Sequence, residues 1–214
     1  MVRIIVVRHG ESLGNAHHLF LGHTDMDLSE HGYRQARALA DYLKKEEKID
    51  KIYSSDLLRA YNTVKTYADG VGMEVITSEN LREIYAGDFE GREFEELAVS
   101  YGDFFTVEWV KNFGTFKLPN GEAILDAGKR FRDEVLRIAS ENEGKTILIG
   151  AHAAVIRSFW GIISGIAPDE LAEKLPHPSN ASCNYCVYDG ERLVPERYSV
   201  DFYLEKVGVT KLNM

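Results

Sequence analysis

The hydrophobic positions of this chain change their period several times, and each change marks an expected element. Residues 2–7 form a nearly continuous apolar run, which is typical of a strand covered on both faces. From Ser29 onward the apolar residues recur with helical spacing, and Ser29 is the expected N-cap. The residues on that helical face are Tyr33, Ala36, Ala40 and Leu43.

The rest of the chain continues this alternation of strands and helices. Further strands are expected over 49–53, 73–77 and 146–149, and a hairpin over 182–199 turns at Asp189-Gly190. One helix is expected to start after Asp56, which is its possible N-cap. Two more are expected along the periodic segment 124–138 and from His152. This order predicts an α/β three-layer sandwich: a mostly parallel sheet with helices on both faces and room for one antiparallel strand.

The stretch from about 84 to 120 differs from its surroundings. It carries nine aromatic residues and many acids, but only three cations, Arg92, Lys111 and Lys117. We expect it to be an inserted cap of short helices and loops within a single domain spanning 1–214. Most of the rings are expected to form the core of the cap. Some of them, with Leu19, Phe20 and Leu21, are candidates for a pocket mouth that favours an apolar or aromatic leaving group.

Composition narrows the possible partners. A net charge of −9 and a pI near 5.3 argue against a nucleic-acid surface. No stretch approaches the ~20 apolar residues of a membrane span, and the opening residues do not resemble a signal peptide, so a cytoplasmic location is expected. Cys183 and Cys186 have a Cys-x-x-Cys spacing, but no second pair completes a zinc site. On a strand they point to opposite faces, so we interpret them as buried thiols.

Polar residues gather where three expected strands end. Arg8 and His9 follow the first strand, Arg59 follows the second, and His152 follows the strand at 146–149. In a parallel sheet these ends share one edge, where ligands bind. Taken singly, Arg8 could reach solvent and Arg59 could pair with Asp56. Their coincidence favours a functional site.

The residues at these positions resemble those of the histidine phosphatase superfamily, which includes the cofactor-dependent phosphoglycerate mutases. Five ordered blocks covering almost the whole chain carry the similarity. They are Arg8-His9-Gly10-Glu11 with Asn15, Gly22-x-x-Asp25-x-x-Leu28-Ser29-x-x-Gly32-x-x-Gln35-Ala36, Ser55-Asp56-Leu57-x-Arg59-Ala60-x-x-Thr63, Leu81-Arg82-Glu83-x-x-x-Gly87-x-x-Glu90-Gly91, and His152-Ala153-x-x-Ile156-Arg157.

The resemblance implies a role for each matching residue. His9 would be the nucleophile, Glu83 the general acid and base, and three side chains would clamp the phosphoryl oxygens: Arg8, Arg59 and His152. The remaining candidates for phosphate or substrate binding are Asn15, Thr24, Ala153 and Glu11. For Thr24 a local turn role, and for Glu11 a surface role, remain alternatives.

The chemistry suits these residue types. A phosphoryl group in transfer carries charge on its equatorial oxygens, and arginine presents a planar fork that stays charged. A neutral imidazole can attack phosphorus and split one difficult displacement into two. The cations come from side chains, so no metal and no cofactor are expected. The expected partner is a small-molecule phosphate ester; the oligomeric state is left open.

Departures from the family pattern concern the substrate more than the reaction. Ala153 replaces the usual glycine, Leu19 and Leu21 replace an Arg-x-Gln, Asp27 replaces a proline, and Ala123 replaces a serine. An acidic, aromatic cap lacks cations for a second phosphate, so we favour a phosphomonoesterase over a phosphoglycerate mutase. A non-catalytic phosphate-binding or protein-interaction module is the second alternative.

Overall fold

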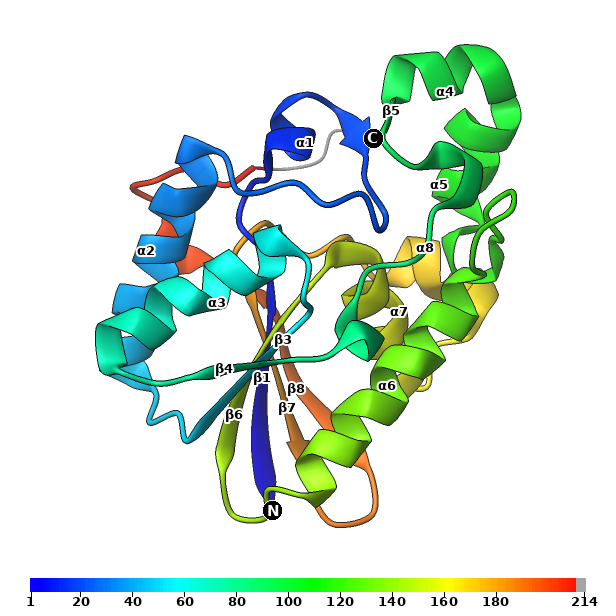
Figure 1. Ribbon diagram of the computed structural model, residues 1–214. Helices are drawn as coiled ribbons and strands as arrows, with labels where there is room; N and C mark the ends of the chain where they lie inside the picture. Colours follow the sequence, from blue (N-terminus) through cyan, green and yellow to red (C-terminus); the bar gives the residue numbers. More distant parts are fainter. Residues whose placement is uncertain (211–214) are drawn as a thin grey trace.

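A six-stranded sheet forms the centre of the computed structural model, which describes residues 1–210 (Figure 1). The last four positions of the single domain expected over 1–214 lie outside these residues. The strand order is β4-β3-β6-β1-β7-β8. The strands are β1 (Val2–Arg8), β3 (Lys51–Ser54), β4 (Val75–Thr77), β6 (Thr146–Ala151), β7 (Cys183–Tyr188) and β8 (Leu193–Val200).

The sheet is mostly parallel, as predicted. β1 pairs in parallel with β6, β6 with β3, and β3 with β4. Only β7, which is antiparallel to both β1 and β8, runs against the others. The sequence left room for one antiparallel strand in a mostly parallel sheet, and β7 is that strand.

Helices cover both faces of the sheet (Figure 1). Helices α2 (Glu30–Glu46) and α3 (Leu58–Val71) pack on one face, and α6 (Ile124–Ser140) and α7 (Ala153–Ile163) on the other. Alternate residues of β1 divide between the two cores: Ile5 and Val7 face α2 and α3, while Ile4 and Val6 face α6 and α7. Burial on both sides explains the nearly continuous apolar run of this strand.

The two cysteines follow the same alternation. Both are free and buried, and β7 places Cys183 in the core under α2 and Cys186 in the core under α6. The interpretation as buried thiols on opposite faces is confirmed. Burial raises the pKa of both thiols to about 12, which keeps them protonated at neutral pH.

Helix starts agree with the sequence in one case and correct it in another. Ser29 caps α2, because its side chain accepts a hydrogen bond from the N–H of Gly32. The expected cap Asp56 is wrong: its carboxylate pairs with Arg82 instead. The N–H of Leu58 at the start of α3 donates to Asp25, 2.8 Å away, which comes from a distant loop.

The segment from 84 to 120 consists of short elements above the carboxyl ends of the strands (Figure 1). They include β5 (Arg92–Glu93), α4 (Phe94–Tyr101), a π-helical turn (Phe104–Glu108) and α5 (Trp109–Lys111). β5 pairs with β2 (Leu19–Phe20), which follows the short helix α1 (Leu13–Ala16). The remaining short helix, α8 (Leu171–Lys174), precedes β7.

Aromatic packing holds this segment to the loop after α1. The ring of Phe20 contacts those of Phe89, Phe94, Phe105 and Trp109, with centroid distances between 5.3 and 6.3 Å. Such edge and tilted ring pairs add to the free energy of apolar burial. Most of the aromatic residues thus form a core of the cap segment, as predicted. No helix within 1–210 is long and apolar enough to cross a membrane.

Candidate active site

The ends of β1 and β6 bring two histidines together. The backbone N–H of His9 donates to the carbonyl of Ala151 at 3.0 Å, which continues the β1–β6 ladder by one residue. The imidazole rings of His9 and His152 consequently lie edge to face, with centroids 5.3 Å apart. The predicted convergence of distant segments on one sheet edge is present in the fold.

A backbone hydrogen bond sets the tautomer of His9. Its Nδ1 lies 2.6 Å from the carbonyl oxygen of Gly10. A carbonyl can only accept, so Nδ1 carries the hydrogen and Nε2 keeps its lone pair. The loop itself is held because the N–H of Gly10 donates to Thr63, whose hydroxyl donates in turn to the carbonyl of Arg59.

The environment of His9 keeps the ring neutral. Burial, then the charges of Arg59 and Arg8, holds its pKa well below the ordinary value. A neutral imidazole with a free Nε2 is the nucleophilic form.

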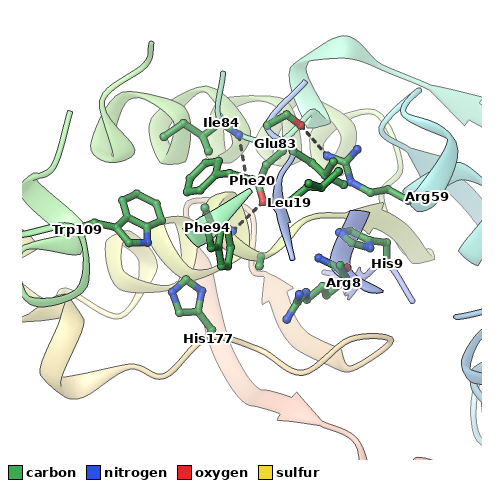
Figure 2. A pocket seen from close by; sticks show the side chains of 15 residues that line it. Arg8, His9, Leu19, Phe20, Arg59, Glu83, Ile84, Phe94, Trp109 and His177 are labelled. Atoms are coloured by element: carbon green, nitrogen blue, oxygen red, sulfur yellow. Dashed lines mark hydrogen bonds between the residues drawn. The ribbon is translucent and has the colours of Figure 1, made fainter. Parts of the chain in front are cut away.

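Two buried arginines lie beside His9, and within residues 1–210 their hydrogen bonds go to backbone carbonyls (Figure 2). Arg8 donates to the carbonyl of Pro178 at 2.6 Å, and its Nε has no hydrogen-bond partner within 1–210. Arg59 donates to the carbonyls of Gly22 and Thr24, at 2.6 and 2.9 Å. Burial lowers the pKa of each guanidinium to about 10, so both remain charged at neutral pH. The carboxylate of Glu83 in the same pocket offsets only part of these two charges, so the pocket favours an anion.

His152 lies beside His9 with both ring nitrogens buried and unpartnered within the described residues. It is the N-cap residue of α7, where backbone N–H groups face outward. Burial, then the charge of Arg59, lowers its pKa well below the ordinary value. Buried polar atoms are normally paired, so these free nitrogens are unusual. His152 is not among the residues that line the pocket; it lies behind His9 and next to the lining residue Ala153.

Glu83 is attached to the start of α7. One carboxylate oxygen accepts from the N–H groups of Ile84 and Val155, at 3.0 and 3.1 Å, and the other from Ala154 at 3.1 Å. Its backbone carbonyl accepts from Arg130. Both ends of the residue are held, which orients the carboxylate at the pocket wall.

The secondary candidates divide into two groups. Asn15 and Ala153 line the same pocket as Arg8, His9, Arg59 and Glu83. Thr24 and Glu11 are not among its lining residues. The hydroxyl of Thr24 donates to Glu90 at 2.6 Å, and Glu11 accepts from Ser29 and Thr210. The structure thus gives Thr24 and Glu11 partners within the loops around the site.

The segment between α8 and β7 supplies residues that sequence reasoning missed. Besides the Pro178 carbonyl, Asn180 donates to the carbonyl of His9 at 3.0 Å, and His177 lines the pocket. Polar residues next to proline in a loop are common, so nothing local singled these out. The one feature of the sequence that could have indicated them is the position of this loop, directly before the strand β7 that pairs with β1.

The pocket joins a charged end to an apolar wall. It has a volume of about 80 Å³, and Figure 2 shows Arg8, His9 and Arg59 at one end and Trp109 at the other. Apolar side chains form the wall between them: Leu19, Phe20, Leu21, Ile84 and Phe94. A phosphoryl group fits the charged end, and an alcohol portion would contact the apolar wall.

Comparison with known proteins is consistent with this geometry. The model of the histidine phosphatase superfamily (branch 1) matches residues 4–201. The chain is 34% identical over 212 residues to a putative phosphoserine phosphatase 2 of Hydrogenobacter thermophilus, covering 99% of this chain and 98% of the relative. It is 33% identical over 208 residues to phosphoglycerate mutase-like protein 4 of Arabidopsis thaliana, covering 96% and 88%.

A solved structure shows the same fold. The phosphoserine phosphatase of Entamoeba histolytica in complex with 3-phosphoglyceric acid superimposes with a TM-score of 0.79 at 28% identity. The match covers 95% of this chain and 100% of the other.

Proposed function

This chain belongs to the histidine phosphatase superfamily, and on that premise we propose that it hydrolyses small phosphate monoesters through a phosphohistidine on His9. The observation that carries the proposal is the state of the His9 ring. Its Nδ1–H is bound to the Gly10 carbonyl, and the ring lines a pocket together with the buried, charged guanidinium groups of Arg8 and Arg59. The relatives named as phosphatases support the hydrolysis of phosphate esters.

In the first step Nε2 of His9 attacks phosphorus, and the bond from phosphorus to the ester oxygen breaks. Arg8, Arg59 and His152 donate to the three equatorial oxygens, where charge is spread in the transition state. Glu83, in its protonated form, gives its proton to the leaving oxygen.

In the second step water attacks the phosphorus of the phosphohistidine. Glu83, now ionised, takes a proton from that water as the bond from nitrogen to phosphorus breaks. Inorganic phosphate leaves, and the neutral imidazole of His9 is restored. The positive charge in both steps comes from side chains, so the proposal requires no metal and no cofactor.

Hydrolysis is favoured over isomerisation by the lining of the pocket. The segment 84–120 contributes Ile84, Phe94 and Trp109, none of which carries a charge. A mutase has to retain a bisphosphorylated intermediate, and burying a second dianion without cations is costly. A relative with a mutase-like name keeps phosphoglycerate mutase activity as the alternative to test.

The test measures phosphate release from a panel of phosphomonoesters in the presence of EDTA. We expect turnover by the wild type and by His17→Ala, which changes an exposed histidine that does not line the pocket. His9→Ala should lose at least ~10³-fold in activity. Phosphate-labelled substrate should leave acid-labile label on the wild type and on His17→Ala but not on His9→Ala. Conversion of 3-phosphoglycerate to 2-phosphoglycerate would identify a mutase, and binding without any turnover would identify a binding module.

The role of Glu83 has its own test. Glu83→Gln keeps an acceptor for the backbone N–H groups but has no proton to transfer. We expect a loss of ~10²- to 10⁴-fold with an alkyl phosphate. With p-nitrophenyl phosphate, a good leaving group, the first step should persist, giving a burst of nitrophenol and a long-lived phosphoenzyme. Equal losses on both esters would contradict an acid role.

A further inference from the structure

His177 lies where the catalytic pocket meets a second, larger cavity. Three residues, Arg8, Trp109 and His177, line both the pocket of about 80 Å³ and the adjoining cavity of about 470 Å³. Figure 2 shows the His177 ring between Trp109 and Arg8 along this side of the pocket. The alcohol portion of an ester held at His9, if it extends into the larger cavity, passes the His177 ring.

A neighbouring arginine determines which nitrogen of His177 carries the hydrogen. Nη1 of Arg157 lies 2.8 Å from Nε2 of His177. Guanidinium groups have donors only, so Nε2 accepts and Nδ1 is the protonated nitrogen. That Nδ1 is buried, and no residue within 1–210 accepts a hydrogen bond from it.

Positive charge stands behind this donor. Arg157 is only 5% exposed, and it donates to the carbonyls of Leu175 and Ala172 and to His177. None of these partners is a carboxylate, and its guanidinium lies over the ring of Phe113, 4.3 Å from the centroid. Burial lowers the pKa of Arg157 to about 10, so it remains charged at neutral pH.

The His177 ring itself stays neutral. Burial, followed by the charges of Arg157 and Arg8, holds its pKa well below the ordinary value. The site thus offers an N–H donor polarised by a buried cation, on a residue that lines both the pocket and the larger cavity. An anionic oxygen satisfies both the donor and the charge, whereas a hydroxyl satisfies only the donor.

We propose that His177 is a specificity-determining residue whose Nδ1–H binds a carboxylate oxygen on the alcohol portion of the substrate. The enzyme then prefers phosphomonoesters that carry a carboxylate over neutral ones of the same size. This inference rests on the proposed function, since it concerns the ester bound at His9.

The experiment uses two esters that differ at one group. 3-Phosphoglycerate has a carboxylate where glycerol 3-phosphate has a hydroxymethyl group, and release of phosphate from each gives its kcat/KM. His177→Phe keeps a ring against Phe113, whose centroid lies 5.1 Å away, and removes the donor. We expect it to lower kcat/KM for 3-phosphoglycerate by ~10- to 100-fold, the range for a hydrogen bond to a charged group, and for glycerol 3-phosphate by less than ~3-fold.

Two further variants separate recognition from structure. His177→Asn places an amide N–H near the position of Nδ1 and should recover part of the preference for 3-phosphoglycerate. The exposed His17→Phe is the matched control and should change neither value. A melting temperature of His177→Phe close to that of the wild type would show that the variant is folded.

The outcomes separate the inference from the function on which it rests. If His177→Phe lowers kcat/KM equally for both esters, or for neither, His177 does not bind the substrate carboxylate. The same conclusion follows if the wild type cleaves glycerol 3-phosphate as well as 3-phosphoglycerate, and in both cases the phosphatase assignment stands. If the wild type releases phosphate from no ester and takes no label on His9, the proposed function is the part that fails.

Discussion

Replacing Arg59 by methionine should remove catalysis while leaving the fold nearly as stable as before. The side chain is 1% exposed, and its hydrogen bonds within residues 1–210 go to two backbone carbonyls. Glu83, Asp25 and Glu90 act on the charge only from a distance, and burial outweighs them. Methionine has a similar unbranched stem and no charge. The substitution therefore tests whether this guanidinium serves the ligand or the fold.

The magnitude follows from the burial of the charge. Each pKa unit corresponds to ~1.4 kcal/mol, so a pKa of about 10 for Arg59 in place of its ordinary value means that the folded state disfavours the charge by ~3 kcal/mol. The two hydrogen bonds to Gly22 and Thr24 return a net ~1–3 kcal/mol. These terms nearly cancel, so Arg59→Met should change the free energy of unfolding by less than ~2 kcal/mol.

The sign of the pH dependence is also determined. The folded-state pKa of Arg59 lies below the unfolded one, so the penalty is fully present below pH about 10 and is relieved as the pH rises above it. At neutral pH the whole penalty applies. Losing a clamp on the transferring phosphoryl group should meanwhile lower kcat/KM by ~10³-fold.

The assay is urea unfolding followed by tryptophan fluorescence, alongside turnover of p-nitrophenyl phosphate. Added phosphate should stabilise the wild type and leave Arg59→Met unchanged, because only the wild type binds it well. Arg137→Met is the control: this arginine is half exposed and paired with Glu134 and Glu141, so activity should not change. A loss of more than ~4 kcal/mol in Arg59→Met would refute the reasoning, since Arg59 would then be holding the fold.

The other predictions concern the histidines, a glycine contact and the apolar wall. Burial lowers the pKa values of His9, His152 and His177, so the unfolded state binds more protons than the folded state below pH about 6.5. The free energy of unfolding, measured in urea, should therefore fall by ~1.4 kcal/mol for each histidine with every unit by which the pH decreases. A free energy that stays constant from pH 7 to 5 would contradict this. Gly32→Ala should lower the melting temperature and destabilise the fold by ~3 kcal/mol, because its new Cβ would lie 1.9 Å from a backbone oxygen of the catalytic loop. Phe94→Ala should lower kcat/KM for phenyl phosphate ~10-fold more than for glycerol 3-phosphate, given ~50 Å² of lost apolar contact; equal losses would reject an apolar contact with the leaving group.

The sequence by itself determined the mostly parallel sheet and the location of the candidate site. The nearly continuous apolar run of β1 requires cover on both faces, and parallel strands bring their carboxyl ends to one edge. From these two facts the meeting of His9, Arg59 and His152 follows, and the structure places His9 and His152 with ring centroids 5.3 Å apart. The opposite burial of Cys183 and Cys186 follows equally from the two-residue period of a strand.

Only the tertiary structure determined which donor forms a hydrogen bond with which acceptor. The N–H of Leu58 finds Asp25 rather than the adjacent Asp56, because a distant loop reaches the start of α3 while Arg82 takes Asp56. The hydrogen bond from Arg157 that makes Nδ1 of His177 a donor is of the same kind. Local sequence contains propensities and periods, but hydrogen bonds between distant segments depend on where the packed core brings their ends.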